Sequence, residues 1–552
     1  MQQDFKPFGA LGGWCFSSLV IRINGLGRLA CMTLGKRPAA RSLFRSSAEL
    51  CEDKLSEQSI FALLARDGDR LFPDEAFADL FQRVGRRSVS PRIVVTVMVL
   101  QRFEGLSDRE AVERFAFDVR WKFAAGALDL DHPSFVHTVL VDMRERLRRS
   151  ERPNRVFDVV LEIAKQRGLV GRKRVLDSTA LYDAVATQDT VTMLRSAIRG
   201  VVRVASEALA AELRGVLKRD DDYLNAGKPT CEWDDVDARE QLVDALARDA
   251  LAVLALLHGR KLSAVVAEAA KLLATVAGQD IELEADMFRI VRGVAKDRTI
   301  STVDPEARHG HKTEARGFDG FKGHVAIDPD SEIITATSVT PGNVGDAEAA
   351  KGLLKEALDS SVSDAAHAAP VEVYGDASYG TADLVEHVEG AGATPKMKVQ
   401  AAPSKPGMYS QADFKIDLGA ATVTCPAGNL VKLRATKAGF IAHFSSHCAA
   451  CPLRPSCTNA KEGRIVSVHA KHETLARMRA KQSSSAFTRD YKATRPKVER
   501  KIAHLMRRRH GGRRARMRGA LRVGHDFAML AAAINLARVA VLDAQTSTAS
   551  DL

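Results

Sequence analysis

The sequence of 552 residues lacks any apolar run that approaches the roughly 20 residues of a membrane-spanning helix. Its most apolar early stretch, from Phe16 to Leu29, is interrupted by Arg22 and Arg28, and no cleavage site for a secretory signal follows it. We therefore expect neither a membrane protein nor an exported one. The expected location is the cytoplasm, where thiols stay reduced.

Acidic residues are scarce near the C-terminus. From Ala486 to Arg522 there are 14 Lys or Arg residues against two acids, a difference as large as the net charge of +12 of the whole chain. Such a run is either a solvated face or a surface for a polyanion. Because this density repels itself unless phosphates are present, we predict DNA contacts. The candidate residues are Arg495, Lys501, Arg507, Arg508, Arg509, Arg513, Arg514, Arg516 and Arg518.

Apolar periodicity divides the chain into segments. Residues 1–48 form a poorly patterned arm, and residues 49–170 a helical domain predicted to bind DNA. An α/β core takes residues 171–183 and 299–410, interrupted by a helical insertion at 184–298. A small Cys-rich insertion at 411–480 and a basic helical part of the core at 481–545 complete the prediction.

One helical pair in the first domain has clear end signals. Ser90-Pro91 opens a helix, Gly105 stops it, and Ser107 with Glu110 forms a capping box for the next helix. Two helices joined by a short turn that contains glycine are compatible with a DNA-reading helix-turn-helix and equally with an ordinary helical hairpin. Both interpretations stay open at this point.

Five short β-branched or alternating segments predict the strands of one mixed sheet. They are residues 174–178, 321–328, 333–340, 371–376 and 397–400. Helices follow the third, fourth and fifth strands, and this order is that of an RNase H-like fold. Arg308 to Lys312 are predicted to form a basic loop before the second strand.

Three carboxylates are the candidates for catalysis: Asp177 in the first strand, Asp376 after the fourth, and Glu499 at the start of a basic amphipathic helix. Each alone is compatible with a cap, a turn or a favourable charge near a helix start. The strand order, however, brings all three to one end of one sheet. Converging carboxylates suit two Mg²⁺ or Mn²⁺ ions, which can clamp the attacking and leaving oxygens of a phosphodiester.

Four of the eight cysteines fall within 33 positions: Cys425, Cys448, Cys451 and Cys457. A close C-x₂-C pair with two further thiols suits a tetrahedral, structural Zn²⁺ site. His443 or His447 is an alternative to one of the cysteines, and four unremarkable thiols remain the competing interpretation.

These features together resemble the DDE transposases of bacterial insertion sequences, over residues 77–541. The motifs that carry the resemblance are VLDSTAL, DPEARHGHKTEARGFDGFKGHVAID, VTPGNVGDAEAA, YGDASYG and RPKVERKIAHLMRRRHGGRRARMRG. The resemblance implies that Asp177, Asp376 and Glu499 bind the metal ions. Arg495 and Glu499 match an Arg-x₃-Glu pattern of related transposases, whereas Tyr491 lies one residue too far from Arg495, so we assign it no role.

The activity implied by the resemblance is metal-dependent hydrolysis at transposon ends, followed by strand transfer into target DNA. The partners would be double-stranded DNA and a second copy of the chain, because two DNA ends must be held together. Two alternatives remain: a catalytically inactive, transposase-derived DNA-binding protein, and a stand-alone RNase H-like nuclease.

Overall fold

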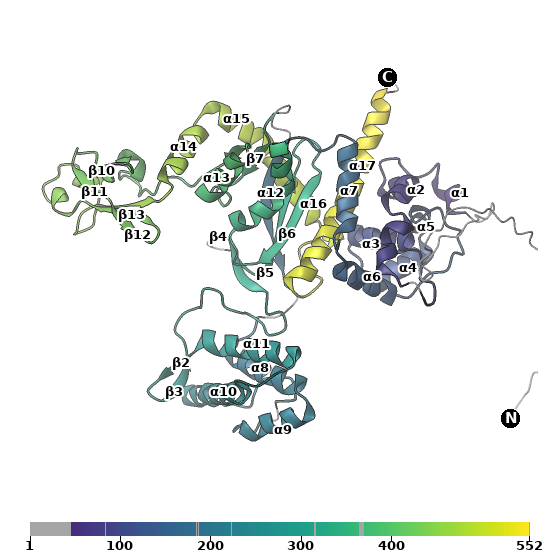
Figure 1. Ribbon diagram of the computed structural model, residues 1–552, viewed down its shortest axis with the longest axis horizontal. Helices are drawn as coiled ribbons and strands as arrows, with labels where there is room; N and C mark the ends of the chain where they lie inside the picture. Colours follow the sequence, from purple (N-terminus) through teal and green to yellow (C-terminus); the bar gives the residue numbers. More distant parts are fainter. Residues whose placement is uncertain are drawn as a thin grey trace, which may run out of the picture.

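The computed structural model describes residues 46–82, 84–183, 185, 187–221, 223–313, 316–363 and 369–550. The arm predicted for residues 1–48 therefore lies almost entirely outside the described residues. Within them the chain is a mixed α/β protein, with one large sheet, three smaller sheets and many helices (Figure 1).

The N-terminal region is helical, and α3 lies at its centre, buried from Pro91 to Arg102. As predicted, α3 begins with a proline and ends at Gly105, whose φ of 70° suits a glycine. The predicted capping box of Ser107 and Glu110 is present at the start of α4. The helices of this region are α1 (Ser47–Cys51), α2 (Ile60–Leu71), α3 (Pro91–Glu104), α4 (Asp108–Phe117), α5 (Val119–Ala124), α6 (Thr138–Arg149) and α7 (Arg155–Gln166).

The five predicted strands form one mixed sheet in the order β6-β5-β1-β7-β8. Strand β1 is antiparallel to β5 and parallel to β7, and β7 is parallel to β8. The bounds are β1 (Lys173–Tyr182), β5 (Arg316–Ile327), β6 (Ile334–Pro341), β7 (Glu372–Gly375) and β8 (Thr394–Met397).

Two details of the sheet differ from the prediction. The expected basic loop is a sixth strand, β4 (Arg308–Thr313), which pairs with the first part of β5 because β5 is long enough to extend past β6. The last strand, β8, begins at Thr394, three residues before the predicted segment. It tolerates Pro395 because it is an edge strand with one unpaired side.

Helices cover both faces of the sheet (Figure 1). Leu176 and Ala326 face α12 (Asp346–Ser363) and α13 (Ala382–Gly390) in one apolar core. Val175 and Val325, one residue away on each strand, face the opposite core. That second core includes α16 (Pro496–Leu505) and α17 (Ala520–Ser550), and it continues into the N-terminal helices. The alternation places Asp177 on the same face as Val175.

The insertion projects from the sheet and has an apolar core of its own (Figure 1). Its helices are α8 (Thr190–Val204), α9 (Glu207–Val216), α10 (Val236–Leu257) and α11 (Ala264–Asp280). The insertion is not all helical, because β2 (Ile281–Glu284) and β3 (Met287–Ile290) form a hairpin. Ala285 and Asp286 both have positive φ, as a tight two-residue hairpin turn requires.

The Cys-rich segment consists of two small three-stranded sheets around another separate core, at the far end of the molecule from the N-terminal helices (Figure 1). Its strands are β9 (Lys415–Asp417), β10 (Thr422–Thr424), β11 (Leu430–Lys432), β12 (Arg434–Thr436), β13 (Gly439–His443) and β14 (Ile465–His469). Helices α14 (His472–Gln482) and α15 (Ser485–Thr494) lead back from it to the main sheet.

Among the described residues, one helix is long and apolar enough to cross a membrane by length and composition: residues Ala520–Thr546 of α17. Of its most apolar window, 61% is buried inside the protein, where α17 packs against α3, α7 and β6. This pattern is typical of the central helix of a globular core.

Candidate active site

Asp177 lies in the middle of β1 with 15% of its side chain exposed. Burial raises the pKa of this carboxyl, and the positive charge of Arg495 works in the opposite direction. The backbone N–H of Ser178 donates to its Oδ1 at 2.8 Å. The side chain is therefore held in place, and a neighbouring cation favours its carboxylate form.

Asp376 follows the last residue of β7. Val175 of β1 lies beside Tyr374 of β7, and the two strands run in parallel, so Asp177 and Asp376 come two residues later at the same end of the sheet. The N–H of Ser378 donates to Asp376 Oδ1 at 2.9 Å, and 44% of the side chain is exposed.

Glu499 lies in the first turn of α16, whose buried face is formed by Val498, Ile502 and Leu505. That buried face fixes the rotation of the helix and leaves Glu499 at its margin, 64% exposed. Arg495, four residues earlier, comes immediately before the helix and lies on the same side.

The guanidinium of Arg495 lies between the three carboxylates. Its Nη2 is 3.1 Å from Asp177 Oδ1 and 3.7 Å from Asp376 Oδ2, and its Nη1 is 3.6 Å from Glu499 Oε1. Only 8% of the Arg495 side chain is exposed. Burial lowers its pKa, but Asp177 and Asp376 outweigh that effect and raise it. The structure thus brings together all three predicted carboxylates around one cation.

Tyr491, to which the sequence pattern gives no role, also reaches this site. Its hydroxyl donates to the carbonyl of Gly375 at 3.2 Å, directly before Asp376. Its ring stacks on Phe487 and lies under Lys398. The four-residue steps from 491 to 495 to 499 were the available signal, because such steps keep side chains on one side of the chain as α15 passes into α16.

A second polar cluster lies on the other face of β1. Ser178 Oγ donates to Asp346 Oδ2 at 3.0 Å, and Lys322 Nζ lies 3.1 Å from Asp346 Oδ1. Asp346 is the first residue of α12, so the sequence alone is compatible with a role at the start of the helix. His324 is fully buried beside this cluster; its Nε2 bonds to Thr340 Oγ1 at 2.9 Å, and burial lowers its pKa to about 4. His324 is therefore a neutral sheet residue.

Carboxylate oxygens are the ligands that Mg²⁺ prefers, so the chemistry of the three acids fits divalent ions. In the described part of the chain, however, no group of three or more His, Cys, Asp or Glu side chains is arranged to hold a metal ion as it stands. At the carboxylates the reason is Arg495, which takes up the space that the three side chains share.

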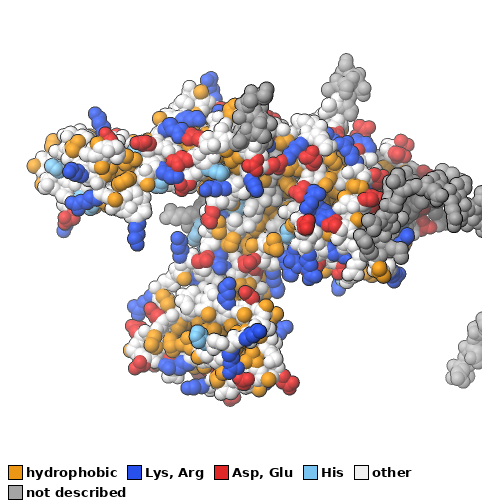
Figure 2. Space-filling view, in the orientation of Figure 1, with side chains coloured by type: hydrophobic (Ala, Val, Ile, Leu, Met, Phe, Trp, Pro, Cys, Tyr) orange, Lys and Arg blue, Asp and Glu red, His pale blue; other side chains and the backbone are white. Residues whose placement is uncertain are grey.

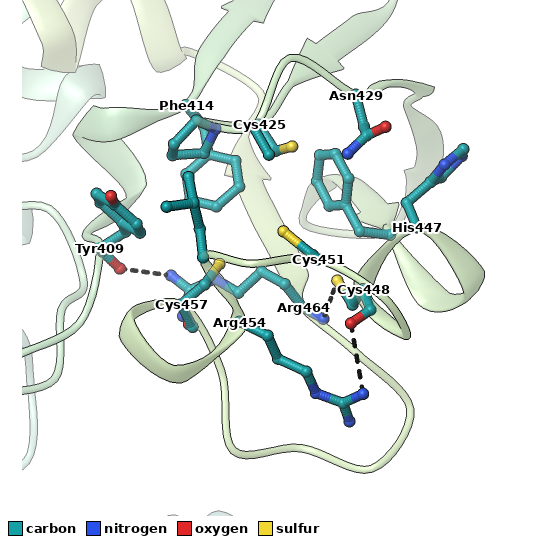
Figure 3. Close-up of a pocket in the computed structure, with 14 residues that line it drawn as sticks. Tyr409, Phe414, Cys425, Asn429, His447, Cys448, Cys451, Arg454, Cys457 and Arg464 are labelled. Atoms are coloured by element: carbon teal, nitrogen blue, oxygen red, sulfur yellow. Dashed lines mark hydrogen bonds between the residues drawn. The ribbon is translucent and has the colours of Figure 1, made fainter.

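The four clustered cysteines line one cavity together with His447 (Figure 3). The cavity has room for about 20 Å³, enough for one water molecule or ion. Burial raises the pKa of the Cys457 thiol, and the other three cysteines add to this effect. Since the described residues contain no metal-binding arrangement, the predicted zinc site is not supported.

The predicted DNA-binding residues divide into exposed and buried ones. Six arginines between 507 and 518 are exposed and one, Arg516, is half-buried. Lys501 is 1% exposed, and burial lowers its pKa to about 8 despite nearby Glu332. Its prediction as a DNA contact is corrected, because it faces the core. Arg495 pairs with carboxylates and has little surface left for DNA.

The exposed arginines are attached to the strand that carries Asp177. The N–H of Tyr182, at the end of β1, donates to Arg513 O at 2.8 Å, and Ala515 N–H donates to Tyr182 O at the same distance. Five residues of strand separate Tyr182 from Asp177, which corresponds to roughly 17 Å. The middle of the basic segment is therefore joined to the end of the strand that carries Asp177.

Comparison with protein families gives two matches. Residues 424–540 match the family described as transposase DDE domain, and residues 50–146 match the transposase domain DUF772. The first range contains Glu499 and the cysteines but not Asp177 or Asp376. No curated protein and no solved structure matches the chain.

The DDE domain implies an RNase H-like fold, with which the mixed sheet is compatible. The resemblance to the DDE transposases of insertion sequences is therefore confirmed, by two transposase domains that flank the sheet in the sequence.

Proposed function

We propose that the protein binds the terminal inverted repeats of an insertion sequence and catalyses cleavage and strand transfer of DNA with divalent metal ions. The observation that carries the proposal is the convergence of Asp177, Asp376 and Glu499 on the single guanidinium of Arg495. Three acids from distant parts of the chain share one cation there, which is unusual for residues that only cap or terminate elements.

Asp177, Asp376 and Glu499 are the residues that would hold two Mg²⁺ or Mn²⁺ ions. Bound ions would supply an activated water molecule and neutralise the charge that develops on the phosphorus. The positive charge of Arg495 opposes the rise that burial causes in the pKa of Asp177, which favours the carboxylate form that binds a metal ion. Tyr491 anchors the helix that carries Arg495 to the backbone next to Asp376.

The remaining residues would bind and orient DNA. The exposed arginines 507–509, 513, 514 and 518 would contact backbone phosphates, and Arg513 and Arg514 among them lie at the end of β1. Double-stranded DNA is thus the proposed partner, for transposon ends and target alike. A dimer is proposed because two ends must be held at once, and the cytoplasm is the proposed location.

The test is cleavage of a labelled duplex that carries the element's own end, with Mg²⁺ or Mn²⁺. We expect nicking at the element boundary by the wild type and none by Glu499→Gln, with equal DNA binding by both. Glu473→Gln, which removes an exposed acid from α14, is the matched control and should cut normally. Binding without cutting by the wild type would instead identify a DNA-binding protein without catalysis. Cutting without joining would identify a nuclease.

A further inference from the structure

A cavity of about 610 Å³ lies where α3 and α6 of the N-terminal region meet the start of α17. It shares no residue with the carboxylate site. Its wall includes the apolar side chains of Met98, Leu147 and Met529, and it is rich in basic groups. These are Arg102, Arg144, Arg148, Arg516, Arg522 and His525. Figure 2 shows Lys and Arg side chains gathered on the surface around α6 and the start of α17.

The charges in this cavity are only partly balanced. Three of its four carboxylates are engaged: Asp526 lies 3.1 Å from Arg102 Nε, and Asp108 and Glu145 pair with Arg144 and Arg148. Arg516 and Arg522, in contrast, form no ion pair with any described carboxylate. Burial lowers the pKa of Arg102, and the nearby charges of Arg516 and Arg144 lower it further, against the effect of Asp526. The lining therefore holds five guanidinium groups against four carboxylates, an excess of one positive charge.

Three nitrogen atoms of side chains that line this cavity are buried without a hydrogen-bond partner: Arg102 Nε, Arg516 Nη1 and His525 Nε2. Arg102 Nε lies 3.1 Å from Asp526 Oδ1, whereas Arg516 Nη1 and His525 Nε2 have no ion pair with a described residue to take its place. The other groups of the same side chains are engaged. Arg516 Nη2 donates to Leu106 O at 2.6 Å, and His525 Nδ1 donates to Asn154 Oδ1 at 2.8 Å. Buried polar atoms are nearly always satisfied, so these two point to a ligand that supplies the missing partner.

We propose that the cavity binds a nucleotide phosphate, either a phosphodiester of a DNA strand or the phosphate of a free nucleotide. A guanidinium matches the oxygens of a phosphate in a bidentate way. His525 Nε2 donates only when the imidazole is protonated, and burial lowers the pKa of His525, so the charge of a bound phosphate would have to offset that effect. The apolar wall and the volume suit a base or sugar next to the phosphate.

The place of the cavity favours the DNA strand as the source. Arg516 follows Arg513 and Arg514, which pair with the end of β1. A strand that leaves the carboxylates along β1 would thus pass Arg513 and Arg514 before it reaches Arg516. This source, but not the free nucleotide, rests on the proposed function.

The experiment compares the wild type with the double variant Arg516→Gln/Arg522→Gln, using the full chain. Binding of deoxyadenosine monophosphate is measured by calorimetry, and binding of a fluorescent duplex by anisotropy at several salt concentrations. Arg109→Gln is the matched control, because Arg109 is exposed on α4 beside the cavity but does not line it. A thermal unfolding curve of each variant verifies folding, and Arg516→Lys, which keeps the charge, serves if the double variant is unfolded.

We expect the nucleotide to bind the wild type and Arg109→Gln, and to bind the double variant at least about tenfold more weakly. If DNA is the source, duplex affinity also falls, and the slope of log K against log salt decreases by about two, one for each lost phosphate contact. Unchanged duplex affinity with lost nucleotide binding would identify a free nucleotide as the ligand. Equal binding of both ligands by all variants would show that the cavity is not a phosphate-binding site. If the wild type bound the nucleotide but no DNA, the proposed function would be wrong and the proposed nucleotide site would still be supported.

Discussion

The carboxylate site and the cysteine cavity were both predicted as metal sites, but their candidate ligands are brought together in different ways. The carboxylates Asp177, Asp376 and Glu499 are separated by up to 322 positions, yet each lies within 4 Å of one guanidinium. The cysteines fall within 33 positions and line one cavity; as they stand, neither they nor the carboxylates form a metal-binding arrangement in the described residues.

The difference teaches that convergence depends on the elements that carry the ligands more than on their spacing in the sequence. Asp177 and Asp376 are fixed by the pairing of β1 with β7, and Glu499 by the buried face of α16. The cysteines lie in turns and in a single-turn helix between strands of three to five residues. Register and helix packing define positions closely, whereas short loops leave them to local detail.

The largest effect is expected at the carboxylates. Asp177→Asn keeps the shape of the side chain but removes the charge, and we expect cleavage to fall about 10³-fold, or about 4 kcal/mol of transition-state stabilisation. The rate of nicking and the affinity for DNA are measured on the same duplex. Cys451→Ser is the counterpart in the cysteine cavity and should cut at the wild-type rate. An equal loss of cleavage in Asp177→Asn and Cys451→Ser would show that both sites are needed for cleavage, against this distinction between them.

The next effect concerns the cation in the carboxylate site. Arg495→Gln leaves Asp177 buried beside two other acids, and we expect the free energy of unfolding to fall by about 3 kcal/mol. Because a divalent ion can replace the lost charge, Mg²⁺ should raise the melting temperature of the variant more than that of the wild type.

Arg500→Gln is the control for this change. Arg500 is 60% exposed and pairs with Glu332, so its loss should lower the stability by less than about 1 kcal/mol and leave the Mg²⁺ effect unchanged. If Mg²⁺ stabilised the wild type, Arg495→Gln and Arg500→Gln equally, the carboxylates would not be the place where the ion binds.

The predictions from sequence succeeded where one dominant pattern decided the structure. Alternation placed β1, β5 and β6, and proline, glycine and the capping box defined the ends of α3 and the start of α4. The juxtaposition of Asp177 and Asp376 followed from the order of strands alone. These features depend on local sequence and on the number of strands, both of which can be read from a single chain.

The misses share a dependence on contacts between distant segments. Lys501 is an exception, because it lies at position i+3 of the apolar stripe Val498, Ile502 and Leu505, so helical spacing already indicated that it faces the core. Strand β4 forms because β5 extends past β6, and Asp346 meets Ser178 and Lys322 only once α12 packs on the sheet. Neither length nor periodicity contains that information.

A smaller effect is expected behind the carboxylate site. Asp346→Asn keeps an acceptor for Ser178 but removes the charge that Lys322 pairs with. We expect β1 to be held less firmly at Asp177, with cleavage about tenfold slower, DNA affinity unchanged and a stability loss of about 1–2 kcal/mol.

The control is Glu348→Gln, which changes an exposed acid on the same turn of α12 and should behave as wild type. Adding Lys322→Met to Asp346→Asn should restore part of the stability, since no unpaired charge remains. A normal cleavage rate in Asp346→Asn would show that Ser178 and Asp177 need no support from α12.

The smallest effect is expected from zinc removal. Structural zinc contributes on the order of 10–16 kcal/mol to small domains that need it, so its loss cannot be silent if the cysteines hold it. The arrangement of Cys425, Cys448, Cys451 and Cys457 around an apolar core with Phe414 and Phe444 predicts instead that the segment is stable without metal.

The measurement is treatment with a zinc chelator, followed by return of Mg²⁺. We expect an unchanged melting curve and unchanged cleavage, with less than one zinc per chain before treatment. One zinc per chain, together with a lost unfolding transition after chelation, would place the cysteine cavity beside the carboxylates as a second metal site, and it would mean that the thiols move together when the ion binds.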